Sequence, residues 1–243
     1  MTASKIIIIG VSGPSSSGKS TLARLLRYVL PNSFILHQDD FYKPEAEIPV
    51  VNDLEDWDCP EAIDYIALRA AIDYIKKNHK LPENVHYKED QNDLGTPPVS
   101  SEEADAIKKA ILGQDISIAD NVEFCIVDGF LLFNDDIITK QLDVKLLLRA
   151  PYESLKKRRE ARSGYATIEG FWVDPPGYFD NIVWPGYVNA HKHLFEGEDI
   201  EGPLAPYAIQ QDIRTASAID LHMRDMLKWA LDVIAEKFKK LSS

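Results

Sequence analysis

Short apolar runs along the chain alternate with longer segments in which apolar residues recur every three or four positions. The runs are rich in β-branched residues, as expected of strands buried on both faces, and lie at Ile6–Val11, Ser33–His37, Phe124–Val127 and Val144–Leu148. Helical spacing occupies 22–29, 63–75, 103–112, 152–162 and 221–241. This alternation predicts an α/β fold with a mainly parallel central sheet and helices on both faces.

Two of the helical segments carry predicted core faces. The segment after Asp58-Cys59-Pro60-Glu61, which could cap it, would turn Ile63, Ile66, Ala70 and Ile75 inward. The segment Glu103–Leu112 would turn Ala106, Ile107, Ala110 and Ile111 inward.

The segments between these elements suggest one domain over 1–243 with two additions. Residues 79–122 begin with a polar stretch containing Pro82, Gly95, Pro97 and Pro98, which is typical of an exposed insertion. Gly170–Tyr187 is rich in aromatic residues, glycine and proline, so we expect a loop there. Together with the helix before it, this loop forms a predicted lid region at about 152–187.

The charge balance narrows the possible partners. The chain has 243 residues and a net charge of −12, which disfavours nucleic acid and anionic membrane surfaces, since both attract basic proteins. Two cysteines cannot form a disulfide framework, and neither a signal peptide nor a transmembrane stretch is visible. These features predict a cytoplasmic protein with a small-molecule substrate; they do not distinguish a monomer from a homodimer.

A glycine-rich motif connects the first predicted strand to the first predicted helix. The segment Gly13-Pro14-Ser15-Ser16-Ser17-Gly18-Lys19-Ser20 satisfies G-x-x-x-x-G-K-[ST]. Backbone N–H groups of such a loop point into one concavity, and the helix that follows directs its positive end there. Lys19 would hold the outer phosphates, and the Ser20 hydroxyl is a hard oxygen ligand for Mg²⁺. The motif predicts ATP and Mg²⁺ binding in a three-layer P-loop NTPase fold.

Acidic residues follow two other predicted strands. Asp39 and Asp40 lie just after the second strand, and Asp128 ends the third. Because ligands of open α/β sheets lie beyond the carboxyl ends of the strands, these side chains can face the phosphate loop. A kinase needs a carboxylate for the proton of the acceptor hydroxyl and an acid near the metal. Asp39 is the candidate base and Asp128 a candidate metal-linked acid, although each could be an ordinary turn residue.

The predicted helix at 152–162 is strongly basic. Arg158 and Arg162 are four residues apart and share one face, whereas Arg159 points about 100° away. One face could therefore close over ATP while Arg159 reaches the acceptor and stabilises the phosphoryl group in transfer. The alternative is a solvated helix face.

Several motifs together give the chain a resemblance to nicotinamide riboside kinases, within the uridine-kinase-like group of P-loop kinases. They are the phosphate loop with Thr21-Leu22-Ala23, Gln38-Asp39-Asp40-Phe41-Tyr42-Lys43-Pro44, Trp57-Asp58, Asp128-Gly129-Phe130-Leu131-Leu132-Phe133-Asn134, Pro151-Tyr152-Glu153, Arg158-Arg159 with Arg162, Pro176-Gly177-Tyr178-Phe179-Asp180, and Val183-Trp184-Pro185.

The resemblance implies ATP-dependent phosphorylation of the 5′-hydroxyl of nicotinamide riboside, and commonly of nicotinic acid riboside, on a route to NAD. It implies that Asp39 is the catalytic base and lies near Mg²⁺ with Ser20, and that Asp40, Phe41 and Tyr42 border the substrate. By the same resemblance, Trp57 stacks on the pyridine base, with Tyr165 as a second face, while Asp58 and Arg159 hold the ribose hydroxyls. Arg158 and Arg162 correspond to the lid over ATP. A pyridinium is attracted to aromatic faces, in agreement with this assignment.

The sequence also departs from the family and leaves alternatives open. The family usually has glutamate where this chain has Asp128, which shortens the reach to a metal by one methylene. A uridine or cytidine kinase would use the same phosphate loop and Asp39, but a neutral pyrimidine needs hydrogen-bond partners at its edge. A non-catalytic nucleotide-binding regulator would need no acceptor base. ATP or GTP as donor, and the amide or acid riboside as acceptor, stay undecided.

Overall fold

A five-stranded parallel sheet forms the centre of the protein. The computed structural model describes residues 5–83, 85, 98–112, 122–162, 164–166 and 171–242. The sheet comprises β1 (Lys5–Ser12), β2 (Ser33–His37), β5 (Val122–Asp128), β6 (Val144–Leu147) and β9 (Ile213–Thr215), in the order β2-β5-β1-β6-β9. All its pairings are parallel, which confirms the predicted fold class. Strand β9 was missed because three residues are too few to form a recognisable apolar run.

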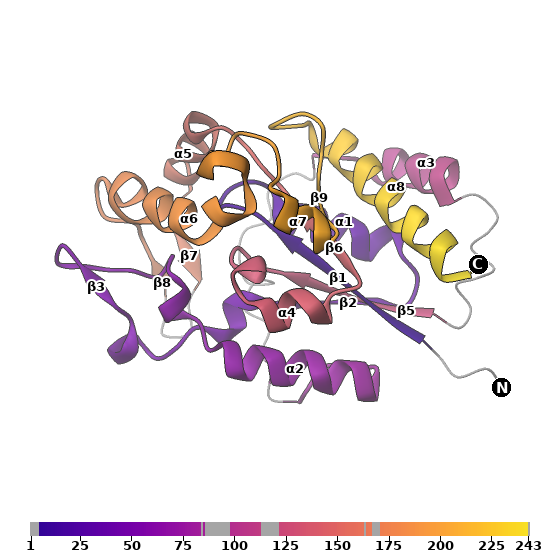
Figure 1. Ribbon diagram of the computed structural model, residues 1–243, viewed down its shortest axis with the longest axis horizontal. Helices are drawn as coiled ribbons and strands as arrows, with labels where there is room; N and C mark the ends of the chain where they lie inside the picture. Colours follow the sequence, from indigo (N-terminus) through magenta and orange to yellow (C-terminus); the bar gives the residue numbers. More distant parts are fainter. Residues whose placement is uncertain are drawn as a thin grey trace.

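Helices cover both faces of the sheet (Figure 1). On one face α1 (Lys19–Val29), α3 (Ser101–Leu112) and α8 (Met223–Ser242) share a core with alternate residues of β1, such as Ile7 and Ile9. On the other face α2 (Tyr65–Asn78), α4 (Asp136–Gln141) and α7 (Pro206–Gln210) pack on Ile8 and its neighbours. Each strand thus buries both sets of side chains, which explains its unbroken apolar sequence.

The predicted inward faces of two helices were partly wrong. In α2 the buried residues are Leu68, Ala71, Ile72 and Ile75, whereas Ile66 is 78% exposed. The helix begins at Tyr65 because the Asp64 side chain accepts a hydrogen bond from the Ala67 N–H (2.9 Å), so the face is rotated from the one expected. In α3 the buried residues are Ala104 and Ile107, while Ala106 and Ala110 are exposed.

Part of the predicted insertion at 79–122 belongs to the core. Helix α3 packs against α1 and α8, and Val99 beside it is buried in the same cluster. Residues 84, 86–97 and 113–121 lie outside the described part of the chain.

The second half of the predicted loop at Gly170–Tyr187 is helical. A π-helical turn (Phe179–Val183) leads into α6 (Trp184–His191). Its apolar side chains Phe179, Ile182 and Val183 are buried against Leu155 of α5 (Tyr152–Glu160). Burial of these residues stabilises the helical turn, and Pro185 lies in the first turn of α6, where its missing N–H is tolerated.

Two short hairpins lie beyond the carboxyl ends of the central strands. One pairs β3 (Val50–Val51) with β4 (Leu54–Glu55), and the other pairs β7 (Tyr165–Ala166) with β8 (Phe171–Trp172). Both lie on the same side of the molecule as α5 and α6 (Figure 1). Among the described residues, no helix has the length and apolar character to cross a membrane.

Candidate active site

The phosphate-loop sequence forms a tight turn between β1 and α1. Gly13, Ser16 and Gly18 have φ angles of 148°, 66° and 93°, and such positive values favour glycine. A Cβ on Gly13 would lie 2.6 Å from the carbonyl oxygen of Leu148, so a larger residue would clash with the backbone. The Ser17 N–H donates to the Pro14 carbonyl (3.1 Å), which closes the turn.

The polar groups of this loop fit an anionic ligand. The hydroxyls of Ser12, Ser16 and Ser17 are buried and have no hydrogen-bond partner among the described residues. Buried hydroxyls normally have partners, and phosphate oxygens could supply them. Lys19 begins α1, so its positive charge and the positive end of the helix lie at the same place.

Asp128 lies beside this loop at the end of β5. It is 4% exposed, and its Oδ2 lies 3.2 Å from Nδ1 of His37, the last residue of β2. Burial alone would raise its pKa, but the His37 hydrogen bond, the Lys19 charge and a Ser20 hydrogen bond together lower the pKa below its ordinary value. The carboxylate is therefore ionised at neutral pH.

Asp128 and Ser20 together fit a magnesium ion. Asp128 Oδ1 is buried without a hydrogen-bond partner among the described residues. A carboxylate and a hydroxyl are hard oxygen ligands, and Mg²⁺ usually takes its other ligands from phosphates and water. Within the described ranges, no three His, Cys, Asp or Glu side chains gather into an all-protein metal site.

A row of aromatic rings leads away from Lys19. The Lys19 ammonium lies 6.0 Å from the centre of the Phe130 ring. The ring centres of Phe130 and Tyr42 are 6.2 Å apart, and those of Tyr42 and Trp57 are 5.5 Å apart in an edge-to-face arrangement. Phe130 follows Asp128-Gly129, and Tyr42 follows the 3₁₀ turn Gln38–Phe41 after β2. The row therefore connects the phosphate loop to Trp57 through neighbouring side chains.

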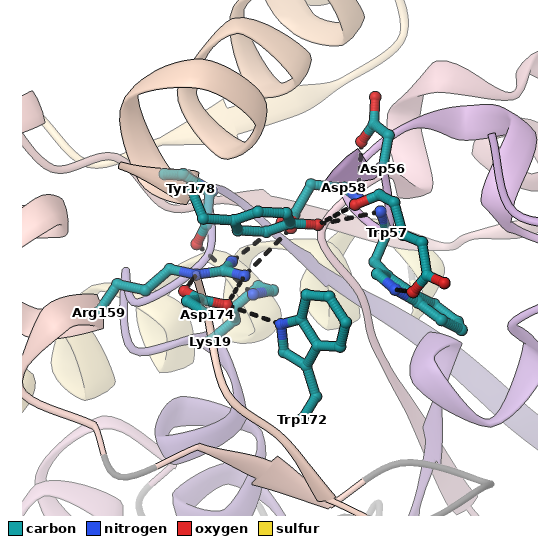
Figure 2. A network of polar contacts seen from close by, with 10 residues as sticks. Lys19, Asp56, Trp57, Asp58, Arg159, Trp172, Asp174 and Tyr178 are labelled. Carbon is teal, nitrogen blue, oxygen red and sulfur yellow. Dashed lines mark hydrogen bonds and ion pairs between the residues drawn. The ribbon is translucent and has the colours of Figure 1, made fainter. Parts of the chain in front are cut away.

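Arg159 is held between two carboxylates next to Trp57 (Figure 2). It makes paired hydrogen bonds to Asp58 (3.1 and 3.2 Å) and to Asp174 (2.6 and 3.1 Å). Its side chain is 6% exposed and that of Asp58 is 9% exposed. The planar guanidinium matches two carboxylates in this way, which fixes its position.

Trp172 is an aromatic neighbour of Trp57 that the sequence did not reveal. Their ring centres are 6.1 Å apart at an angle of 57°, and Trp172 donates its indole N–H to Asp174 (2.9 Å). The buried Tyr178 accepts from the Trp57 N–H (3.2 Å) and donates to the Glu55 carbonyl (2.8 Å), so it anchors this segment. Figure 2 shows these side chains converging from separate segments of the chain.

The structure thus brings some predicted residues together and separates others. Trp57, Asp58 and Arg159 cluster, and Tyr42 borders them. Phe41 does not: it is 9% exposed and belongs to the core cluster that contains Leu68 and Ile72. Asp39 is exposed on the 3₁₀ turn, and the carboxylate oxygens of Asp40 are buried. The side chain of Tyr165 lies outside the described residues.

Of the two remaining arginines, Arg158 pairs with a segment that reaches the phosphate loop. Arg158 is 46% exposed and pairs with Asp220 at 2.6 Å. Three residues later, the Met223 side chain comes so close to the loop that a Cβ on Gly18 would meet it at 2.7 Å. Arg162 is exposed just beyond α5. The first residue of α8 therefore borders the phosphate loop, which the sequence did not predict.

The curated proteins of similar sequence share one name. No protein-family model matches the chain. The chain is 41% identical to the nicotinamide riboside kinase of Schizosaccharomyces pombe, over 95% of this chain and 96% of that protein. It is 41% identical to the Saccharomyces cerevisiae enzyme of the same name (85% and 86% covered) and 32% identical to nicotinamide riboside kinase 1 of Homo sapiens (81% and 80%). A solved sugar kinase from Janibacter is more remote, with 13% identity and a TM-score of 0.43 over 96% of this chain and 98% of that one.

Proposed function

The chain belongs to the nicotinamide riboside kinase family, and from that premise we propose that it transfers the γ-phosphoryl group of ATP to the 5′-hydroxyl of nicotinamide riboside. The product is the mononucleotide, a precursor of NAD, and nicotinic acid riboside is a second proposed acceptor. The observation that carries the proposal is the continuity between the phosphate loop and the Trp57–Asp58–Arg159 cluster, through Phe130 and Tyr42.

At the donor end, the loop 13–20 binds the triphosphate, and Thr21 lies at the start of the same helix. Lys19 neutralises the outer phosphates and stabilises the charge that develops during transfer. Ser20 and Asp128 hold Mg²⁺, which supplies further neutralisation of the phosphate oxygens when bound. Arg158 lies on α5 and Arg162 two residues beyond its end, and in the proposed lid both would close over this end.

At the acceptor end, Trp57 binds the base, and Asp58 with Arg159 binds the ribose hydroxyls. Burial raises the pKa of Tyr42 well above its ordinary value, and the charges of Asp39 and Asp58 raise it further. Asp39 lies on the 3₁₀ turn that directly precedes Tyr42, and Tyr42 contacts Trp57, so this turn borders the proposed acceptor site. Asp39 accepts the proton of the 5′-hydroxyl. The hydroxyl oxygen forms a bond to the γ-phosphorus of ATP, and the bond between the γ-phosphorus and the bridging oxygen breaks, so that ADP leaves.

An acceptor panel tests this proposal. ADP release is measured with nicotinamide riboside, nicotinic acid riboside, uridine, cytidine and no acceptor. We expect turnover with the pyridine ribosides and only background without acceptor. Turnover with pyrimidine nucleosides alone would identify a uridine or cytidine kinase, and background with every acceptor would indicate a nucleotide-binding regulator. The cytoplasmic location and the lack of a nucleic-acid partner stay predictions.

A further inference from the structure

Trp57 and its neighbour Trp172 each donate the indole N–H to a carboxylate. Trp57 donates to Glu55 Oε2 and Trp172 donates to Asp174 Oδ1, each at 2.9 Å. The two rings also lie next to each other, with centres 6.1 Å apart and planes inclined at 57°. We infer that Glu55 and Asp174 make this tryptophan pair selective for a positively charged base ring. The inference rests on the proposed function and specifies the substrate class at that site.

The hydrogen bonds to Glu55 and Asp174 occupy the only polar group of each indole. An indole has one N–H donor and no acceptor. Neither tryptophan can therefore read the polar edge of a base while these bonds persist, and each offers the base only its π-face. Recognition through π-faces alone favours a cation, because the ring quadrupole attracts positive charge and tryptophan does so most strongly.

The charged side chains around the two tryptophans also favour a cationic base. Glu55, Asp56, Asp58 and Asp174 lie on or beside the two tryptophans, and among the described residues the guanidinium of Arg159 is the cation that pairs with Asp58 and Asp174. The carboxylates on the N–H groups also place negative charge in the plane of the indoles, at partly buried positions where screening by water is reduced. A cationic ring between the tryptophans would be stabilised by this field, and a neutral ring of the same shape would gain nothing from it.

Asp174 additionally ties the tryptophan pair to the ribose site. Its carboxylate accepts from Trp172 and from Arg159, and Arg159 in turn holds Asp58. A base ring sandwiched between the two indoles needs about 7 Å between them, which is the sum of one van der Waals contact distance on each face. The pair at 6.1 Å and 57° must therefore open and align to admit a base. Asp174 is a positioning residue that fixes Trp172 relative to Arg159.

The decisive experiment compares two ribosides that differ in charge. Nicotinamide riboside carries a pyridinium, and its 1,4-dihydro form has nearly the same shape without the charge. Binding of each to the full chain is measured by isothermal titration calorimetry at pH 8. The main variant is Glu55→Gln, whose amide oxygen can still accept from the Trp57 indole. The matched control is Asp53→Asn, which makes the same charge change at an exposed turn of the same hairpin.

We expect Glu55→Gln to weaken binding of the cationic riboside about three- to tenfold, with less than a twofold change for the dihydro form. Trp172→Phe, which keeps a ring but lacks the N–H, should show the same selective loss, and Asp53→Asn should change neither affinity. Equal losses for both ribosides, or no loss for the cation, would overturn the inference while the proposed function stands. Failure of the unmodified chain to bind nicotinamide riboside would overturn both.

Discussion

Replacement of Arg159 by methionine tests whether the buried cluster of Asp58, Arg159 and Asp174 is held together as described. Methionine has a similar length and no charge, so the change leaves Asp58 buried at 9% exposure without its partner. Loss of one member of a buried ion pair destabilises a protein by about 3–5 kcal/mol. For a chain of this size each kcal/mol lowers the melting temperature by roughly 2–4 °C. We therefore expect a fall of about 6–20 °C.

Thermal unfolding followed by circular dichroism at pH 7 measures this change, and the neighbouring residue provides a control. Arg158 pairs with Asp220 at the surface, with 46% of its side chain exposed, so Arg158→Met should cost about 0–1 kcal/mol and at most about 4 °C. The double variant Asp58→Asn with Arg159→Met should recover part of the loss, because it removes the unpaired charge. A melting temperature for Arg159→Met equal to that of Arg158→Met would refute the account of the cluster.

Three further changes have definite expected outcomes. Lys19→Ala should weaken ATP binding and slow transfer, because it removes the charge at the phosphate loop; an unchanged rate and affinity would contradict this. Trp57→Ala should raise the KM for riboside more than the KM for ATP, whereas equal increases would indicate a purely structural residue. Asp56→Asn tests the pH dependence of stability. Burial raises the pKa of Asp56 to about 6 from its ordinary 3.8, so the folded state binds this proton more tightly than the unfolded state. The unmodified chain therefore loses stability as the pH rises from about 4 to 7. Urea unfolding should show the variant to be about 1 kcal/mol more stable at pH 7, after allowance for its partial exposure, and equal to the unmodified chain near pH 4.

The central fold was predictable because its strands are buried on both faces. Ile6–Val11 and Phe124–Val127 have no polar interruption, so their apolar runs identify them directly. The helical turn at Phe179–Val183 was not predictable from the same reasoning, since its apolar residues are buried by contact with α5 and follow no local helical period. The rotated face of α2 likewise depends on the cap at Asp64, which competes with the Asp58–Glu61 segment as a starting point.

The candidate site shows a similar division. The phosphate loop and the end of β5 follow from local sequence, because loop geometry and strand ends place Lys19 and Asp128 together. Trp172 and Asp174 could not be found in this way, since they meet Trp57 and Arg159 only through the packing of distant segments. Their one local signal is the spacing Trp-Val-Asp, which lets the indole N–H reach the carboxylate two residues on.

The central claim is that the loop 13–20 binds the triphosphate while Asp39 accepts the proton of the acceptor hydroxyl. Asp39→Asn is the most direct test, with transfer to nicotinamide riboside followed in a single turnover and ATP affinity measured separately by calorimetry. We predict a fall in the transfer rate of about 10²–10⁴-fold, typical of a lost general base, with ATP affinity changed less than about twofold. A transfer rate within threefold of that of the unmodified chain would contradict the assignment of Asp39.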